Sequence, residues 1–326
     1  MKSRLFKTTL ITIFLFISLF LLLFASPTQA SRIETLKDLK NFNDFDLGPT
    51  LFYIDANSGD SFDRTLQLTN RGGKLGNYAV EVENFQGSKD NPSQTIVLLG
   101  KKDSPYGARD WTTLELDRFS LQHAERIFFN VNIKVPANVS PGDYYAAVLV
   151  RAVPEDQNQA TNAPTVKITS RVGSLFVLRI AGDVVESGQL DSFSTGKKFY
   201  SSPPVDFRVI FKNTGTVLLQ PAGQITIKNI FGRTVDTIEI QPFRTLRDSI
   251  RLEKVSWEKK YLCGYYTADL KLNRGYGNII DEKSISFWIL PWKFILLALF
   301  TLTLIIAIII FLRRNVSISF RAKKKR

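Results

Sequence analysis

The 326-residue sequence predicts an all-β fold: two β-sandwich domains in tandem, between an N-terminal signal peptide and one C-terminal transmembrane helix. Three observations carry this prediction. Apolar and polar residues alternate through much of residues 31–288, turn-forming residues gather between the alternating runs, and an apolar run lies near each end of the chain. Alternation with frequent Gly, Pro, Asn and Asp is typical of strands with one face on a core. Many short strands of this kind favour sandwiches.

Residues 1–30 have the three parts of a secretory signal peptide. A basic start with Lys2 and Arg4 precedes the apolar run Leu10–Phe24 and the small-residue site Thr28-Gln29-Ala30. This order predicts cleavage after Ala30, and an uncleaved anchor is the alternative. In both cases the middle of the chain lies outside the cytoplasm.

Residues 31–182 are predicted to form the first sandwich. Its clearest alternating runs are Phe62–Asn70, Tyr78–Glu83 and Ile127–Val135. Val166–Ile180 resumes the strand pattern after the polar stretch Pro154–Pro164. We therefore interpret Pro154–Pro164 as a long hairpin loop inside the domain, with an interdomain linker as the alternative.

Residues 183–288 are predicted to form the second sandwich, with the boundary near Gly182-Asp183. A strand that ends in Asn and then Gly occurs in both halves, as Leu66–Gly72 and Val209–Gly215. A strand that opens with two tyrosines also occurs twice, at positions 144 and 265. The repeat indicates one Ig-like unit in each half, and the longer first unit holds an insertion at Phe85–Arg118.

Residues 289–312 are predicted to form the transmembrane helix, and residues 313–326 a basic cytoplasmic tail. Phe294–Leu312 is 19 residues without a charge, which is about 28 Å of helix and close to the thickness of a bilayer core. Trp288 and Trp292 lie where aromatic rings favour the headgroup layer, and Arg313 and Arg314 follow the run directly. Basic residues on the cytoplasmic side would orient a single-pass protein of the cell membrane with its N-terminal part outside.

The charge of the chain follows the same division. The net charge is +13, of which the tail holds seven and the signal peptide three, so about +3 remains for residues 31–312. This balance gives no support for nucleic acid as a partner. The basic tail is expected to meet anionic lipid instead.

Residues for common catalytic or metal chemistry are scarce. His123 and Cys263 are the only histidine and the only cysteine, so no ordinary zinc site is expected. His123 is interpreted as an exposed loop residue, and Cys263, in an aromatic stretch, as a buried thiol. The sequence therefore predicts a protein that is not an enzyme and needs no cofactor. A glycan-processing enzyme with two carboxylates in a cleft is a more distant alternative.

Loops at the ends of the sandwiches are the expected contact regions, because binding residues often lie on loops held by a rigid scaffold. The candidates are Gly87–Pro92, Lys101–Arg109 and Pro154–Pro164. Tyr106 and Trp111 are the candidate ligand-binding residues, since aromatic rings can stack on sugars. A place in the core is the alternative for Trp111.

Several short segments in the second half occur in the order of a known family. They are Val172-Gly173-Ser174-Leu175, Gly182-Asp183-Val184, Asn213-Thr214-Gly215, Pro221-Ala222-Gly223-Gln224-Ile225, Asn229-Ile230-Phe231-Gly232 and Phe287–Trp292. The chain resembles the WxL-interacting surface proteins of Gram-positive bacteria, which have the same layout. The resemblance implies a bacterial cell-surface binding protein, with peptidoglycan associated with the first domain and partner proteins with the second.

Two functional hypotheses follow. The leading one is a non-catalytic, membrane-anchored adhesin or scaffold that binds peptidoglycan, another cell-wall polymer or other exported surface proteins. The alternative is a membrane-tethered assembly factor that, like pilus chaperones, offers a strand edge to exported clients. An unpaired edge strand would favour the alternative.

Overall fold

The computed structural model describes residues 31–153, 170–259 and 262–315. The predicted signal peptide, the predicted loop Pro154–Pro164 and most of the basic tail lie outside these residues. Strands dominate the described chain, and two separate apolar cores confirm the prediction of an all-β protein built from sandwiches.

The first sandwich packs two antiparallel-dominated sheets face to face. One sheet has the order β1-β9-β4-β2, with β7 also paired to β9; the other has the order β3-β11-β10-β5-β6, with β8 also paired to β5. The strands of the first sheet are β1 (Arg32–Thr35), β2 (Phe45–Gly48), β4 (Ser61–Asn70), β7 (Thr112–Leu114) and β9 (Glu125–Lys134). Those of the second are β3 (Leu51–Ala56), β5 (Gly76–Gln86), β6 (Val97–Leu98), β8 (Arg118–Leu121), β10 (Gly142–Val153) and β11 (Arg171–Ile180). A 3-10 turn, η1 (Arg109–Trp111), precedes β7.

The second sandwich is smaller. Its sheets have the orders β12-β14-β17 and β13-β19-β18-β15-β16. The first comprises β12 (Gly188–Thr195), β14 (Val205–Asn213) and β17 (Ser249–Trp257). The second comprises β13 (Phe199–Tyr200), β15 (Ala222–Asn229), β16 (Thr234–Ile240), β18 (Gly264–Asn273) and β19 (Ile280–Ile289). The alternation read from the sequence places Phe207, Val209 and Phe211 inward, and all three are fully buried.

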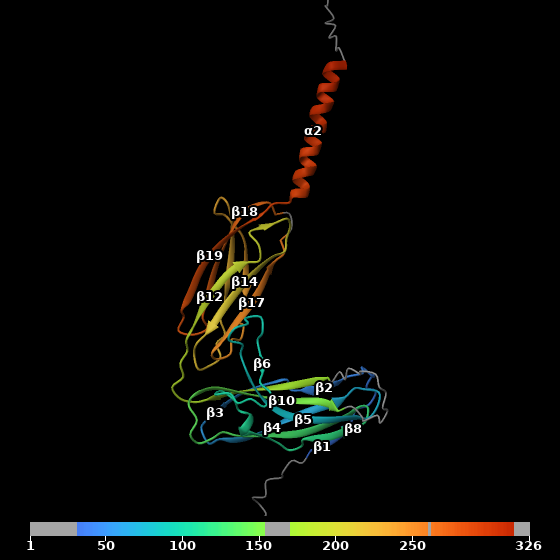
Figure 1. Cartoon of the computed structure of the whole chain (residues 1–326), viewed down its shortest axis with the longest axis vertical. Helices are drawn as coiled ribbons and strands as arrows, with labels where there is room; N and C mark the ends of the chain where they lie inside the picture. Colours follow the sequence, from blue (N-terminus) through green and yellow to red (C-terminus); the bar gives the residue numbers. More distant parts are fainter. Residues whose placement is uncertain (1–30, 154–169, 260–261, 316–326) are drawn as a thin grey trace, which may run out of the picture.

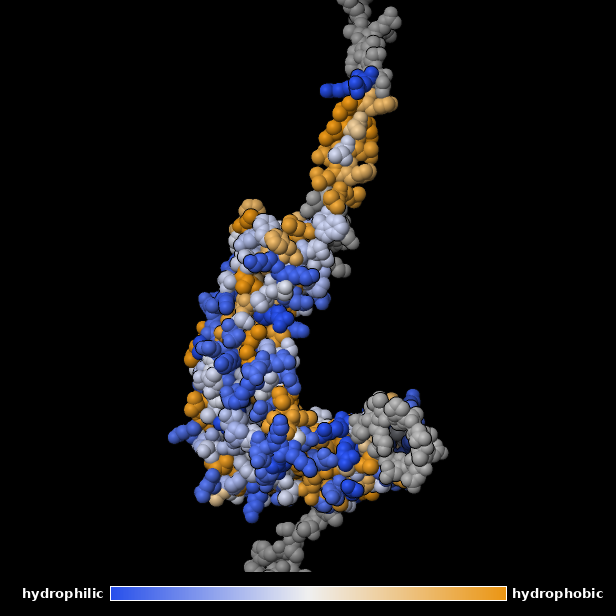
Figure 2. Space-filling model, in the orientation of Figure 1, coloured by the Kyte–Doolittle hydropathy of each residue, from blue (hydrophilic) through white to orange (hydrophobic). Residues whose placement is uncertain are grey.

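The two sandwiches meet in an L shape (Figure 1). The first lies across one end of the second, and the helix α2 (Trp292–Asn315) leaves the opposite end. Apolar residues cover α2, and Arg313 and Arg314 lie in its last turn (Figure 2). Counted over the described residues alone, no helix is both long enough and apolar enough to cross a membrane.

Two single residues correct the sequence interpretation. Cys263 is exposed rather than buried, because its neighbour Leu262 takes the inward position. His123 is half-buried rather than exposed, and its ring nitrogens lie 2.7 Å from the Gly72 carbonyl and 3.1 Å from the Leu39 carbonyl. It therefore joins two loops of the first sandwich.

Candidate functional site

The predicted ligand-binding aromatics both take part in internal contacts. Trp111 packs against the first core, with its ring 4.6 Å from that of Tyr144. The Tyr106 hydroxyl donates to Asp248 Oδ2 at 3.2 Å, and the guanidinium of Arg247 lies 3.8 Å from the Tyr106 ring centre. Both rings are half-buried, and their role in ligand binding stays a prediction.

The predicted interface residues lie at the end of the second sandwich from which α2 leaves. Trp288 is in β19 with its ring 5.1 Å from that of Tyr265, and Trp292 is the first residue of α2. Both indoles are partly exposed, at 38% and 53%. Their contact with a membrane stays a prediction, as does that of Arg313 and Arg314.

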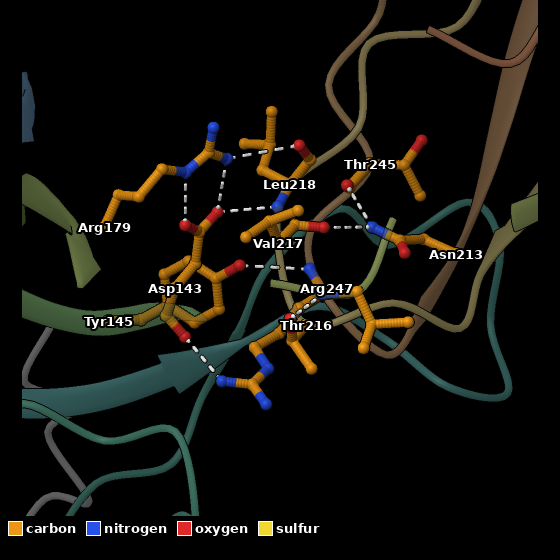
Figure 3. A network of polar contacts seen from close by, with 10 residues as sticks. Asp143, Tyr145, Arg179, Asn213, Thr216, Val217, Leu218, Thr245 and Arg247 are labelled. Atoms are coloured by element: carbon orange, nitrogen blue, oxygen red, sulfur yellow. Dashed lines mark hydrogen bonds and ion pairs between the residues drawn. The ribbon is translucent and has the colours of Figure 1, made fainter. Parts of the chain in front are cut away.

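A buried carboxylate holds the junction between the sandwiches (Figure 3). Asp143, at the start of β10, has no exposed side-chain surface and accepts two hydrogen bonds from Arg179, at 2.8 and 3.0 Å. It also accepts the backbone N–H of Leu218 from the second sandwich, at 2.6 Å. The hydrogen bond to Asp143 raises the pKa of the Arg179 guanidinium. The ion pair itself lies within the first sandwich, and the hydrogen bond from Leu218 ties a loop of the second sandwich to it.

Tyr145 and Arg247 form the second polar contact of the junction (Figure 3). The backbone N–H of Arg247 donates to the Tyr145 hydroxyl at 3.0 Å, and Arg247 Nη1 donates to the Asp143 carbonyl at 3.0 Å. Tyr145 is fully buried, and burial raises the pKa of its hydroxyl. A neutral hydroxyl therefore sits under an apolar cover made by Phe85, Leu218 and residues around them.

The insertion predicted in the first domain reaches the second domain. Its segment Ser88–Pro92 runs along the edge of β17, where Ile250 N–H donates to the Ser88 carbonyl at 2.9 Å and Leu252 N–H to the Pro92 carbonyl at 2.7 Å. Lys89 also pairs with Asp248. The segment covers one part of an edge that would otherwise be open to another strand. The predicted contact loop Gly87–Pro92 is therefore already hydrogen-bonded to β17 of the same chain.

The strand β3 presents a free edge at the same junction. It pairs in parallel with β11, and the bonds from Leu175 N–H to the Thr50 carbonyl and from Ala181 N–H to the Ala56 carbonyl fix the register. In this register the even-numbered residues of β3 face β11. The N–H and C=O groups of Leu51, Tyr53 and Asp55 point the other way, and within the described chain they have no backbone partner.

A pocket of about 360 Å³ lies beside this edge, between the domains. Its apolar wall includes Leu51, Tyr53, Val177, Leu218 and Phe243, contributed by both sandwiches. The outward side chains of β3 therefore form part of the wall. A strand added to β3 would place the residues opposite Leu51 and Tyr53 on the same face, toward the pocket.

The charged groups in the pocket wall are two arginines and one glutamate. The Arg244 guanidinium lies 5.2 Å from the Tyr53 ring centre. Arg251 donates to the Arg244 carbonyl at 3.1 Å, and its Nη2 lies 3.8 Å from Glu253. Arg251 Nε is buried and has no hydrogen-bond partner. The pocket therefore has an excess of positive charge and one unsatisfied donor.

The sequence alone does not indicate this site. The sequence shows β3 only as a short run between Pro49 and the Asn57–Asp60 turn. Its parallel pairing, which leaves alternate backbone groups exposed, depends on β11, more than 100 residues further along the chain. The arginines come from yet another part of the chain, the turn before β17 and β17 itself.

No protein-family model and no curated protein matches the chain. Among solved structures, it is similar to a chain of a chaperone–tip adhesin complex of CFA/I fimbriae biogenesis, with 11% identity, a TM-score of 0.37, and coverage of 76% of this chain and 99% of that one. It is also similar to the class 5 fimbriae chaperone CfaA (11%, 0.35, 76% and 100%) and to the E. coli chaperone DraB (13%, 0.34, 76% and 96%). At these identities and TM-scores the likeness carries no functional conclusion.

Proposed function

We propose that this protein is a non-catalytic assembly factor that binds an extended segment of another exported protein by strand addition at β3. The observation that carries the proposal is the free edge of β3 beside the interdomain pocket. Strand addition uses main-chain hydrogen bonds for affinity and pockets for alternate side chains for specificity. Three outward N–H groups and three outward C=O groups on β3 suit this mode of binding.

The pocket suggests which segments bind. Residues opposite Leu51 and Tyr53 would enter it, so a segment with large apolar residues at alternate positions fits best. Arg244 and Arg251 favour a carboxylate close to that segment, because only Glu253 offsets their charge in the pocket wall. A C-terminal carboxylate or an acidic side chain would serve.

We further propose, from the sequence of residues 289–312, most of which lie in α2, that this segment holds the protein at the cell membrane, with both sandwiches outside the cytoplasm. The support is the uncharged sequence Phe294–Leu312, the flanking tryptophans and the basic residues that follow. Extraction of cell membranes at alkaline pH tests this anchor, since an integral protein stays in the pellet. Release into the supernatant would contradict it.

Binding at β3 can be tested on the detergent-solubilised full chain with short peptides that alternate leucine and threonine and end in a free carboxylate. Bound peptide is expected to slow hydrogen exchange at Leu51, Tyr53 and Asp55. Tyr53→Pro removes one edge donor and should weaken binding about tenfold, equivalent to about 1.4 kcal/mol. Tyr53→Ala keeps the backbone donor and separates the loss of the ring from the loss of the hydrogen bond.

The matched control is Lys254→Pro, at the part of the β17 edge beyond the reach of Ser88–Pro92. Proline is tolerated where the N–H of an edge strand faces solvent, so the variant should fold and bind normally. Peptides N-methylated at alternate positions should not bind, because they cannot add as a strand. Equal binding of methylated and unmethylated peptides, or a larger loss in Lys254→Pro than in Tyr53→Pro, would overturn the assignment to β3.

A further inference from the structure

Exposed apolar side chains gather at the end of the second sandwich from which α2 leaves. Ile230 and Phe231 are 64% and 90% exposed, and Phe199 is 63% exposed. Figure 2 shows hydrophobic residues at this end of the domain, close to the helix. Neighbouring large apolar side chains with this much exposure are unusual on the surface of a soluble protein.

The strand register shows that these residues share one end with the start of α2. Asn229, the last residue of β15, pairs with Tyr266, which in turn pairs with Phe287 of β19. Phe199 pairs directly with Trp288. The turn after Asn229 and the strand β13 therefore lie at the level where β19 ends and the chain leads into Trp292.

The turn that carries Ile230 and Phe231 is held by its own hydrogen bonds. Asn229 Oδ1 accepts the N–H groups of Phe231 and Arg233, both at 3.0 Å, and the Asn229 carbonyl accepts Gly232 N–H at 2.9 Å. Gly232 has a φ of 72°, a conformation that favours glycine. The two apolar side chains are thus presented outward by a defined turn.

Basic side chains surround this apolar tip. Lys197, Lys198, Arg233 and Lys259 are exposed at the same end of the domain, against the exposed acids Asp206 and Glu258. Apolar and aromatic tips ringed by lysine and arginine suit a bilayer surface, where the rings enter the headgroup layer and the cations meet anionic lipid.

We propose that this end of the second sandwich, formed by the turn Asn229–Arg233 and by Lys197–Tyr200, rests in the headgroup layer of an anionic membrane. The inference relies on the proposed anchoring by α2 and goes beyond it. A single helix would leave the sandwiches free to tilt, whereas a second contact would fix their direction. The interdomain site would then be held at a constant distance from the bilayer.

Depth measurement on the full chain tests this surface. Cys263→Ser gives a cysteine-free background, and Thr234→Cys places an environment-sensitive fluorophore beside the turn while leaving Ile230 and Phe231 intact. The chain is reconstituted in vesicles of phosphatidylglycerol and phosphatidylcholine that contain lipids spin-labelled near the headgroup. The label at position 234 is expected to be quenched, and a label at Lys283→Cys, exposed on β19, is not.

Phe231→Asp in the Thr234→Cys background should remove most of the quenching, and vesicles of phosphatidylcholine alone should reduce it. Because Phe231 is 90% exposed, its replacement leaves the fold intact. Flotation of the chain with the vesicles reports the anchor separately. A chain that floats but shows no quenching at position 234, or equal quenching in Phe231→Asp, would overturn the proposed surface and point to a protein contact there. A chain that does not float would instead refute the anchor.

Discussion

Two buried asparagines occupy equivalent corners of the two sandwiches. Asn70 ends β4, Asn213 ends β14, and both are almost fully buried. In each corner Oδ1 accepts the N–H of the glycine two residues later at 2.9 Å, from Gly72 and Gly215 respectively. The side-chain Nδ2 donates to carbonyls of two loops, so the asparagine replaces a strand partner that the corner lacks.

The corners differ in what lies beyond them. Asn70 holds a loop whose Gly72 carbonyl contacts His123 of the same sandwich. The loop after Asn213 instead receives the other domain: Asp143 N–H donates to the Thr216 carbonyl at 2.9 Å, and Leu218 N–H donates to the Asp143 carboxylate. The same local device therefore serves only its own domain in the first sandwich, whereas in the second it builds the interdomain junction.

The largest effect is expected for Asn213→Ala. Its Nδ2 lies 2.8–3.0 Å from the carbonyls of Val217, Thr245 and Leu246. Without this side chain the Val217 carbonyl loses its donor and the Gly215 N–H its acceptor, whereas the Thr245 carbonyl keeps the Leu219 N–H and the Leu246 carbonyl keeps the Ser249 hydroxyl. Buried groups left without partners cost about 1–3 kcal/mol each, though not additively, so we expect a loss of about 3 kcal/mol in the free energy of unfolding. Calorimetry of the full chain should show the second sandwich melting earlier and separately from the first.

Asn70→Ala is the matched variant. It removes donors to the Lys74 and Leu121 carbonyls. The hydrogen bond to Lys74 is only partly buried, so water can replace the lost donor at that carbonyl. A smaller loss of about 2 kcal/mol, confined to the first sandwich, is expected. Equal effects on both melting transitions in both variants would break the distinction between the two corners.

Asp143→Ala should come next, with the free energy of unfolding lowered by about 2 kcal/mol. The change leaves Leu218 N–H without its acceptor and Arg179 without its carboxylate. The penalty for breaking a fully buried pair is larger, but the Arg179 side chain is 43% exposed and water can solvate it. Small-angle scattering should show a broader distribution of interdomain arrangements. Asp143→Asn, which keeps an acceptor, should lie between the variant and the wild-type chain.

The strands and the repeated corners were accessible from sequence because both are local. Alternation identified the inward faces of β9 and β14, and the Asn-x-Gly pattern marked Asn70 and Asn213 without revealing their hydrogen bonds. Burial at single positions was harder to predict. Cys263 lies in an aromatic stretch that resembles core, but the chain turns just before β18 and leaves its thiol outside.

The candidate site was inaccessible because its parts come from distant segments. Tyr106 resembled a surface aromatic, yet Arg247 and Asp248 of the other domain meet it. Nothing in the sequence of β3 indicates that its partner is parallel and that one edge stays free. The insertion Phe85–Arg118 was identified by its length, whereas its attachment to β17 depends on how the two domains meet.

Gly87→Ala tests how the insertion is seated at the Asn213 corner, and we expect the free energy of unfolding to fall by about 1.5 kcal/mol. A Cβ at position 87 would collide with the Cβ of Ser249 and lie 2.6 Å from its Oγ, and overpacking of this kind typically costs 1–3 kcal/mol. Faster hydrogen exchange at Ile250 and Leu252 should accompany the loss. Gly196→Ala is the control, because a Cβ there meets only the Tyr200 hydroxyl at 3.8 Å. Unchanged exchange at Ile250 would show that the insertion is not seated by Gly87.

The smallest effect is expected for Lys89→Ala, which removes the ion pair with Asp248 across the domains. The two side chains are 49% and 40% exposed, and exposed pairs contribute about 0.5 kcal/mol. The loss should disappear in 1 M salt, where screening acts over about 3 Å. Lys271→Ala is the matched control, since its pair with Glu282 joins two strands of one sandwich. Only Lys89→Ala should move the melting transitions of the two sandwiches apart. If Lys271→Ala separates them equally, the Lys89–Asp248 pair has no special part in holding the Asn213 corner against the first sandwich.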